Sequence, residues 1–504
     1  MNSDEVNYLI YRYLQESGFT HSAFTFAHES LVARSIVADA EVPPGALLSF
    51  LQKGLQYIEV ESHLQEDGTE RQCDEPFHLL TPHVCRIKAI QGKSSSSSSD
   101  ASSSSSLIYP EPLPSGTEIP PTDVTVLTGH SAEIYGVAWN PVNNNVLATG
   151  AGDATARLWR LPETPSRSPQ DTASIILRHT GTNETNSKNS KKEKGDVANL
   201  EWNNIGTQLV TGFSDGKLRI WNTDDGNLIN TLGQHTSGIS SIHYNPSGQY
   251  ILSTSYDKTA VLWDSTTGEA RQSFAFHTAP VLDSTWFNDN TFITCSTDKL
   301  IHLCSIGERV PTRTFTGHTD EINSIQLNPS HNLLASGSDD GTIRIWNINS
   351  TNNQDSCTAI LQGGLGYNKR QNIYSVQWSP TGEGSKNPSK TLQLASACFD
   401  GTVKIWDANT LNTSTASSKT SPSATYTLSR HTALVYALGY SPDGEYLVTG
   451  SADRSVYVWS TRDGSVARSY MGPSAVFDVA FSPDSNKIAV AYANGSSTVL
   501  DLRR

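Results

Sequence analysis

Histidine, serine or threonine, and aspartate recur together along this chain at constant spacing, a combination that in one copy would suggest hydrolytic chemistry. His130, for example, is followed by Thr149 and Asp153. Side chains of these types act as base, nucleophile and orienting acid when they converge in a serine hydrolase. Here the same set returns six or seven times, and so many copies of one constellation cannot all be active sites. We therefore predict that each set forms a satisfied polar network that stabilises one repeat.

A second group of residues with ligand chemistry lies in the stretch CDEPFHLLTPHVC. Cys73, His78, His83 and Cys85 could in principle supply four zinc ligands. Their spacing matches no common zinc motif, so the favoured interpretation is a surface segment and zinc binding is the alternative. No phosphate-binding loop or isolated nucleophile stands outside the repeats, and we expect a non-enzyme without catalytic, cofactor-binding or metal-binding residues.

The composition narrows the classes of partner. The 504 residues carry a formal net charge of −14, which disfavours general nucleic-acid binding and favours a basic partner. No apolar run approaches the roughly 20 residues of a membrane span, and the polar N-terminus is unlike a signal peptide. We expect a soluble intracellular protein with reduced thiols, because the six cysteines include no CxxC pair.

The elements that must position these residues are short strands of an internal repeat. Stretches such as LASGSDDGTIRIW and LVTGSADRSVYVW recur with a basic period near the 40 to 45 residues of a WD repeat. Polar insertions such as TNETNSKNSKKEKG lengthen three intervals and are expected to project as loops. The eight copies end at Trp159, Trp221, Trp263, Cys304, Trp346, Trp406, Trp459 and Leu500.

These repeats resemble the WD40 family over residues 122–504, and eight copies imply an all-β propeller of eight four-stranded blades. In that family the His, Ser or Thr, Asp and Trp of a repeat form a buried hydrogen-bonded tetrad. Lys369 and Gly472 stand at the histidine positions of copies six and eight, which predicts incomplete tetrads there, and the role of His179 is open. The resemblance assigns complete tetrads to His130, Thr149, Asp153 and Trp159; His235, Ser253, Asp257 and Trp263; His318, Ser336, Asp340 and Trp346; and His431, Thr449, Asp453 and Trp459.

The two ends of the repeat array are complementary in sequence. The last copy ends in VLDLRR without residues for a fourth strand, whereas DVTVLT precedes the first full copy. We predict that residues 123–128 complete the last blade and so lock the ring. Loss of this strand would expose unpaired sheet edges.

One end of the propeller is predicted to bind peptides. Each first strand starts with a β-branched residue that is expected to point inward, so its neighbours point the other way. By resemblance to other WD propellers, these neighbours and the residue before each tetrad aspartate line the entrance. Aromatic and acidic residues there suit a Lys- or Arg-bearing peptide, although each ring alone could instead pack against a loop. The predicted entrance residues are Glu133, Tyr135, Asp196, Tyr256, Glu321, Asp339, Tyr374, Phe399, Tyr436 and Phe477.

The first residues predict a small all-α module. Apolar side chains in DEVNYLIYRYLQESGF fall at helical spacing, and a second helix is expected from about residue 20. Two such helices have too little core to be stable alone, so association between chains is the simplest remedy. The segment resembles a LisH motif, a dimerising element. The predicted oligomerisation residues are Val6, Leu9, Ile10, Tyr13, Leu14, Phe19, Ala23 and Phe26.

Residues 42–68 resemble the F-box-like segment that accompanies LisH in the transducin beta-like protein 1 family. A serine tract follows and reads as a flexible tether. The predicted domains are a LisH dimerisation motif (1–34), an F-box-like helical segment with an extension (35–90), a Ser/Pro-rich linker (91–121) and the propeller (122–504).

The resemblance implies a nuclear, non-enzymatic scaffold subunit of a histone deacetylase corepressor complex that acts in transcriptional repression. Its N-terminus would form a homodimer or homotetramer and hold the corepressor, and its propeller would bind chromatin or regulator peptides, with basic histone tails as candidates. Direct sequence-specific nucleic-acid binding and membrane binding are not expected. The alternative is a substrate receptor of a ubiquitin ligase, because F-box-like and WD elements also occur there.

Overall fold

In a computed structural model, the chain forms two compact units, Met1–Leu107 and Ile108–Arg504. The predicted second LisH helix, the F-box-like segment, most of the linker and the 73–85 cluster lie outside the described residues. None of the described helices is long and apolar enough to span a membrane. The structure describes residues 3–16, 47, 53, 117–162, 173–179, 195–350, 357–364, 371–411 and 422–503.

The first unit contributes helix α1 (Ser3–Glu16). Leu9 is 8% exposed, and Ile10, Tyr13 and Leu14 are partly buried. The apolar stripe expected from helical spacing therefore lies on a helix. Of the remaining predicted oligomerisation residues, the side chains of Val6, Phe19, Ala23 and Phe26 lie outside the described part of the chain.

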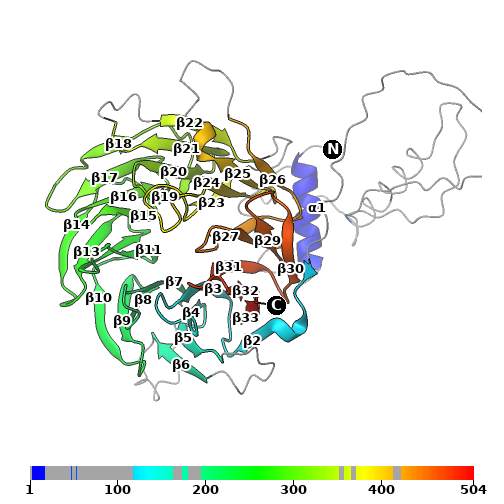
Figure 1. Ribbon diagram of the computed structural model, residues 1–504, viewed down its shortest axis with the longest axis horizontal. Helices are drawn as coiled ribbons and strands as arrows, with labels where there is room; N and C mark the ends of the chain where they lie inside the picture. Colours follow the sequence, from blue (N-terminus) through cyan, green and yellow to red (C-terminus); the bar gives the residue numbers. More distant parts are fainter. Residues whose placement is uncertain are drawn as a thin grey trace, which may run out of the picture. The chain divides into compact units, whose positions relative to one another are not determined.

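The second unit is a ring of eight antiparallel blades (Figure 1). Blade 1 contains β3 (Ile134–Trp139), β4 (Val146–Ala151), β5 (Thr155–Arg160) and β6 (Ala173–Arg178). Blade 2 contains β7 (Val197–Trp202), β8 (Gln208–Phe213), β9 (Lys217–Asn222) and β10 (Leu228–Gly233). Blade 3 contains β11 (Ile239–Tyr244), β12 (Tyr250–Ser255), β13 (Ala260–Asp264) and β14 (Ala270–Phe274). Blade 4 contains β15 (Val281–Asn288), β16 (Thr291–Ser296), β17 (Ile301–Ser305) and β18 (Arg313–Phe315).

The remaining blades repeat this order. Blade 5 contains β19 (Ile322–Leu327), β20 (Leu333–Ser338), β21 (Thr342–Asn347) and β22 (Cys357–Gln362). Blade 6 contains β23 (Ile373–Trp378), β24 (Gln393–Cys398), β25 (Val403–Asp407) and β26 (Tyr426–Leu428), with the short helix α4 (Ala408–Leu411) after β25. Blade 7 contains β27 (Val435–Tyr440), β28 (Tyr446–Ser451), β29 (Ser455–Ser460) and β30 (Val466–Met471). Blade 8 contains β31 (Val476–Phe481), β32 (Lys487–Tyr492), β33 (Ser496–Asp501) and β2 (Val124–Thr128).

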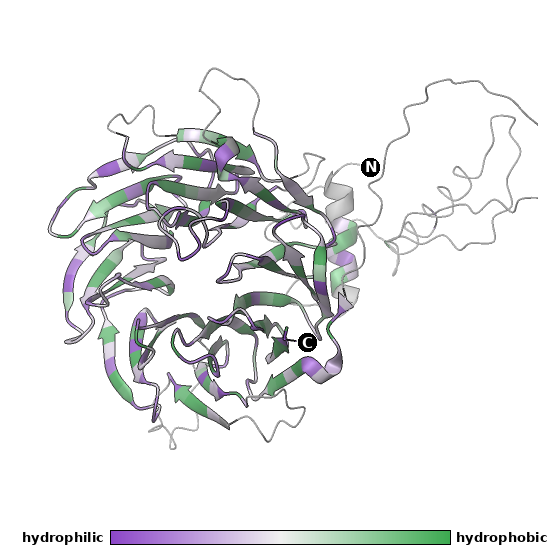
Figure 2. Cartoon of the chain, in the orientation of Figure 1, coloured by the Kyte–Doolittle hydropathy of each residue, from purple (hydrophilic) through white to green (hydrophobic). Residues whose placement is uncertain are grey.

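The hydrophobic core lies between neighbouring blades. One cluster joins Ile405 and Leu428 of blade 6 to Leu447 and Trp459 of blade 7, and other clusters bridge other blade pairs in the same way. Figure 2 shows hydrophobic residues concentrated along the strands of the ring. The β-branched residue at the start of each first strand is at most 4% exposed, so it faces this core as predicted.

Ring closure follows the predicted route. β2 pairs antiparallel with β33, with Thr125 opposite Val499, so the fourth strand of blade 8 comes from the other end of the array (Figure 1). The eight-bladed propeller is thereby confirmed. Part of the predicted linker is also structured, because β1 (Thr117–Glu118) pairs parallel with β30 as a fifth strand of blade 7, and a 3-10 helix (Pro121–Asp123) follows. The propeller unit therefore begins before residue 122.

Candidate peptide-binding site

The side chains of four repeated sets form continuous hydrogen-bond networks. In blade 5, His318 joins Asp340 through Nδ1 (2.8 Å) and Ser336 through Nε2 (2.7 Å), and Trp346 Nε1 donates to Ser336 Oγ (2.8 Å). The corresponding residues of blades 1, 3 and 7 are connected in the same way. Both imidazole nitrogens are engaged and the histidine is buried, so these sets tie strands together.

The aspartates of these networks are stabilised as anions. Burial raises the pKa of Asp340, but hydrogen bonds from His318, Thr342 and the Thr319 backbone outweigh it, so this pKa lies well below its usual value. Asp153 and Asp453 behave in the same way. A carboxylate accepting several hydrogen bonds is the expected cause of such a shift.

Blade 2 departs from the pattern at its aspartate. His179 does join the network, with Nε2 2.7 Å from Thr211 Oγ1, which settles its open role. Asp215 instead pairs with Arg219 at 3.1 Å, and His179 Nδ1 has no hydrogen-bond partner among the described residues. Burial is the largest cause that lowers the pKa of His179, to about 3, and the nearby Arg219 acts in the same direction.

The histidine position of blade 6 differs from the sequence assignment. The N–H of Gly363 donates to Gly341 O, as the N–H of His179 donates to Ala154 O in blade 2. Gly363 is therefore the equivalent residue, and the assignment of Lys369, which lies outside the described residues, was wrong. The offset arose because the stretch from Gly363 to β23 is six residues longer than the stretch from His318 to β19 in blade 5.

Blade 8 fills its histidine position in another way. A Cβ on Gly472 would lie 2.3 Å from the ring of Tyr492, so the tyrosine ring takes the space that an imidazole would need. Tyr492 is buried and its hydroxyl lies 2.8 Å from Thr498 Oγ1. The predicted absence of a complete tetrad in this blade agrees with these contacts.

A β-bulge positions the predicted entrance residues. In each of the eight first strands the pairing with the second strand skips the residue after the β-branched one. The skipped residues include Tyr135, Tyr374, Tyr436 and Phe477. A bulge leaves one residue unpaired and re-aims its side chain, so these rings turn away from the cores between blades.

Five of the predicted rings form a continuous row across four blades. Phe399 and Tyr374 stack with centroids 6.5 Å apart, and Tyr374 meets Tyr436 edge-on at 5.5 Å. Tyr436 meets Phe477 at 5.5 Å, and Phe477 stacks on Tyr135 at 5.9 Å. All five are partly exposed, with Tyr374 the most exposed at 40%. The row therefore offers ring faces and edges to a ligand while being held by its own members.

Carboxylates lie at both ends of this aromatic row. Burial raises the pKa of Tyr135, and Asp196 and Glu133 raise it further. Near the other end, burial, Tyr436 and then Asp339 raise the pKa of Tyr374, the second ring of the row. Asp196 and Glu133 are exposed, whereas Asp339 accepts a hydrogen bond from Asn323 Nδ2 at 2.6 Å.

Two predicted entrance residues stand apart from this row. Tyr256 is 52% exposed and makes no ring contact with another described aromatic residue. Glu321 is exposed at the start of β19, and its backbone oxygen accepts from the N–H of Asp339. They are available to a ligand but are not organised by neighbouring rings.

The sequence interpretation missed a polar group on the first strands of blades 2 to 4. His243 Nε2 lies 3.9 Å from Asp283 Oδ1. Burial lowers the pKa of His243, but Asp283 and Glu201 outweigh it, so this pKa lies above its usual value. Glu201 and His243 both stand four residues after the β-branched residue of their strand, which is the sequence signal that could have identified them.

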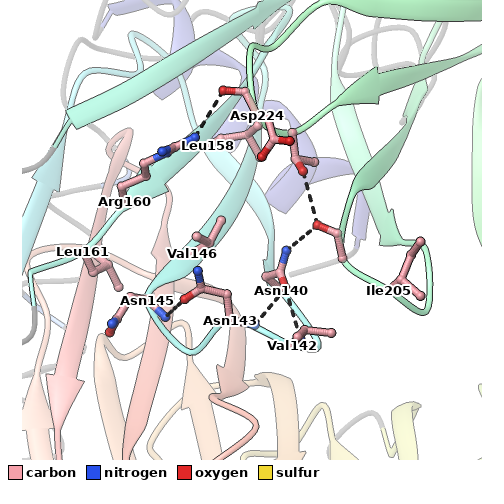
Figure 3. Close-up of a pocket in the computed structure, with 12 residues that line it drawn as sticks. Asn140, Val142, Asn143, Asn145, Val146, Leu158, Arg160, Leu161, Ile205 and Asp224 are labelled. Atoms are coloured by element: carbon pink, nitrogen blue, oxygen red, sulfur yellow. Dashed lines mark hydrogen bonds between the residues drawn. The ribbon is translucent and has the colours of Figure 1, made fainter.

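A separate pocket of about 280 Å³ lies between blades 1 and 2 (Figure 3). Its rim carries Val142 and Ile205, which are 68% and 67% exposed. Asn140 Nδ2 donates to Gly206 O at 2.7 Å and Arg160 donates to Asp224 O at 3.1 Å, so the polar groups mainly join the two blades. The pocket and the aromatic row lie at opposite ends of β3. Tyr135 of the row is the second residue of this strand, whereas Asn140 of the pocket follows its last residue, Trp139.

Comparison with known proteins places the chain in a family. The model "WD domain, G-beta repeat" matches residues 121–160, 188–222, 226–264, 309–347, 356–407 and 422–460, and the LisH model matches residues 4–30. The F-box-like/WD repeat-containing protein TBL1X of Mus musculus is 40% identical over 553 residues, covering 100% of both chains. TBL1Y of Homo sapiens is 40% identical over 548 residues with the same coverage. The chain belongs to the TBL1 family of F-box-like/WD repeat-containing proteins.

More distant relatives also match most of the chain. The WD40 repeat-containing protein HOS15 of Arabidopsis thaliana is 33% identical to this TBL1 family member, covering 100% of this chain and 99% of the relative. The crystal structure of the C-terminal WD40 domain of Sif2 matches 75% of this chain and 99% of its own, with 25% identity and a TM-score of 0.60. The predicted family and fold class are thus confirmed.

Proposed function

We propose that this TBL1 family member is a nuclear, non-enzymatic scaffold subunit of a histone deacetylase corepressor complex acting in transcriptional repression. The LisH match supports oligomerisation through the N-terminus, and the WD40 propeller supports protein binding. The proposed division of labour places corepressor binding in the N-terminal region and peptide binding at the propeller entrance. Histone tails are the proposed class of basic peptide.

The observation that carries the peptide-binding role is the aromatic row with carboxylates at its two ends. A Lys or Arg side chain over an aromatic face gains about 0.5–1 kcal/mol when exposed and about 2 kcal/mol when desolvated. Exposed Asp196 and Glu133 would add charge complementarity and attract a basic segment over a distance. The net charge of −14 acts in the same direction.

Substitution of two central rings tests the entrance. We expect Tyr374→Ala combined with Tyr436→Ala to weaken binding of fluorescently labelled histone-tail peptides by at least about 10-fold, because truncating two central aromatic residues at about 1 kcal/mol each removes that much affinity. Fluorescence anisotropy at fixed salt measures the dissociation constant.

Tyr446→Ala is the matched control for this experiment. Tyr446 is a partly exposed tyrosine at the start of β28. The other end of this strand, Ser451, pairs with Val435 near the entrance, so Tyr446 lies away from the aromatic row. It should leave both affinity and fold unchanged. Equal affinity of the double variant and the wild type would remove the aromatic row from the site.

The complex itself is tested by co-purification from cells. The intact chain and a chain lacking residues 1–90 are purified and their partners identified by mass spectrometry. A deacetylase and a corepressor recovered only with the intact chain would support the proposal. A cullin and its adaptor in their place would support the second candidate, a ubiquitin ligase substrate receptor, which the F-box-like designation of the relatives favours.

A further inference from the structure

Blade 4 breaks the repeat pattern at three alternate positions at and just before its third strand. Cys304 replaces the tetrad tryptophan, and none of the six matched repeat ranges covers this residue. In blades 1, 3, 5 and 7 a serine or threonine stands two residues after the tetrad aspartate, whereas blade 4 has Leu300 at this position. His302 occupies a position held by arginine in blades 1, 2 and 5.

These changes bring two imidazoles and a carboxylate together in the interior. The rings of His277 and His302 lie 4.3 Å apart, and His277 Nδ1 is 2.9 Å from Asp298 Oδ2. One ligand atom from each of the three residues lies within 4.8 Å of the other two. His302 is 5% exposed and the Asp298 side chain is 4% exposed, so the group is shielded from water.

One nitrogen in this group is unused. His302 Nδ1 lies 3.0 Å from Thr314 Oγ1, whereas His302 Nε2 is buried without a hydrogen-bond partner among the described residues. A polar atom that is buried without a hydrogen-bond partner lowers stability by about 1–3 kcal/mol. A ligand bound to His302 Nε2 would remove this cost. The imidazole of His277 lies beside it, and protonating both rings would place two like charges in contact. Two neutral imidazoles can instead share one metal ion.

The carboxylate also has capacity for a cation. In blade 5, Thr342 donates its hydroxyl to Asp340 Oδ1 at 2.6 Å, but Leu300 in blade 4 offers only its backbone N–H, at 3.0 Å from Asp298 Oδ1. The missing hydroxyl leaves a lone pair of Asp298 Oδ1 available. Carboxylate oxygen and imidazole nitrogen are both zinc ligands.

The surrounding hydroxyls resemble the outer layer of a metal centre. His277 Nε2 lies 2.9 Å from Thr294 Oγ1, and Thr314 holds the other ring. Each imidazole therefore has one nitrogen fixed by a threonine, as in metal sites whose histidines are oriented by hydrogen bonds.

We propose that His277, Asp298 and His302 form a buried site for a divalent transition-metal ion of the zinc class within blade 4. The protein supplies two nitrogens and one oxygen of the tetrahedral shell that zinc prefers. The site lies in the tetrad layer and is distinct from the peptide entrance, so it would stabilise the blade that lacks the tetrad tryptophan.

Metal titration of the full-length chain tests this site. Cys73→Ser and Cys85→Ser are introduced first, so that the 73–85 segment does not supply thiolate ligands. The chelator-treated protein is titrated with Zn²⁺, and separately with Co²⁺, whose visible absorption reports the ligand set. We expect one Zn²⁺ per chain that survives gel filtration, and a higher melting temperature with Zn²⁺, because an ion that binds the folded state stabilises it.

Two substitutions then locate the ion. His302→Gln should abolish the stoichiometric site, and Thr314→Val, which removes only the outer hydroxyl, should weaken it by about 10- to 100-fold. If His302→Gln is poorly folded by circular dichroism, His302→Val replaces it, since blade 3 carries Val261 at the equivalent position.

His331→Asn is the control, because His331 is exposed and adopts a left-handed backbone conformation (φ 54°) that Asn tolerates. It should bind Zn²⁺ with the affinity of the background protein. Failure of the background protein to bind Zn²⁺, or unchanged affinity in a folded His302 variant, would overturn the proposal.

Discussion

At the scale of single residues, one hydroxyl is the centre of each tetrad. Ser336 Oγ contacts both His318 Nε2 and Trp346 Nε1, and it is completely buried. In blade 6 the equivalent Ser396 is equally buried, but its Oγ has no hydrogen-bond partner among the described residues. The two serines therefore share position and burial and differ in their hydrogen bonds.

This difference predicts opposite responses to the same substitution. Ser336→Ala leaves a buried imidazole and a buried indole N–H unpaired and should lower the free energy of unfolding by about 2 kcal/mol. Ser396→Ala removes a hydroxyl that is already unpaired and should be neutral or slightly stabilising. Urea unfolding followed by tryptophan fluorescence compares them, and equal losses would contradict the role given to the network.

His179 predicts a dependence of stability on pH. Its pKa of about 3 in the folded state lies below the value of about 6.5 expected in the unfolded state. Between these values the unfolded chain binds more protons, so stability is lost as the pH falls below about 6.5, by up to about 1.4 kcal/mol per pH unit.

The variant His179→Gln isolates this contribution. Other histidines remain in both proteins, so the difference in slope between about pH 6.5 and pH 5 belongs to His179. We expect the variant to have the shallower slope in urea unfolding. Parallel slopes would show that folding does not lower the pKa of His179.

At the scale of elements, the bulge in each first strand points two successive side chains to different surroundings. The β-branched residue before the bulge packs between blades, and the skipped residue points elsewhere. Tyr374 illustrates the result, since it is 40% exposed although Ile373 beside it is completely buried. The bulge thus provides the propeller with both a continuous core and an accessible aromatic row.

Helix α1 gives a prediction at the same scale. Leu9→Glu combined with Ile10→Lys places charges on the apolar stripe, and burying such charges without partners is strongly unfavourable. We expect light scattering to show a shift of the full-length chain toward the monomer mass. Leu9→Met, which keeps an apolar side chain of similar volume, should preserve the oligomer, and an unchanged mass of the charged variant would exclude this stripe from the interface.

At the scale of the whole propeller, closure depends on a strand from the far end of the array. Val124 of β2 is buried in the cluster between blades 7 and 8, and Leu127 is buried in the cluster between blades 8 and 1. β1 adds a parallel strand to blade 7 immediately before this closure. The segment from residue 117 to residue 128 therefore covers the edges of two adjacent blades.

Removal of residues 117–128 should open the ring. Burial of Val124 and Leu127 alone contributes about 3 to 6 kcal/mol, and the exposed edges of β33 and β30 would favour aggregation. Thermal unfolding and gel filtration measure the effect. Deletion of residues 183–192 within an insertion is the control of similar length and should change the melting temperature little; equal effects of the two deletions would contradict closure by β2.

The sequence by itself determined the features that repeat. A period near 42 residues, the recurring polar set and the missing last strand were sufficient for eight blades and for closure by residues 123–128. They also identified every ring of the aromatic row, because periodic strands place equivalent residues at equivalent positions. Local pattern is enough when each unit packs only against neighbours of the same kind.

Only the tertiary structure decided which of these residues meet. Asp215 follows the repeat spacing but pairs with Arg219, and Gly363 rather than Lys369 takes the histidine position of blade 6. The five rings touch because bulges re-aim them across four blades, and the rings of His302 and His277 lie 4.3 Å apart although 25 residues separate them in the chain. Such contacts depend on side-chain direction and on the volume left by neighbours, which spacing along the chain does not encode.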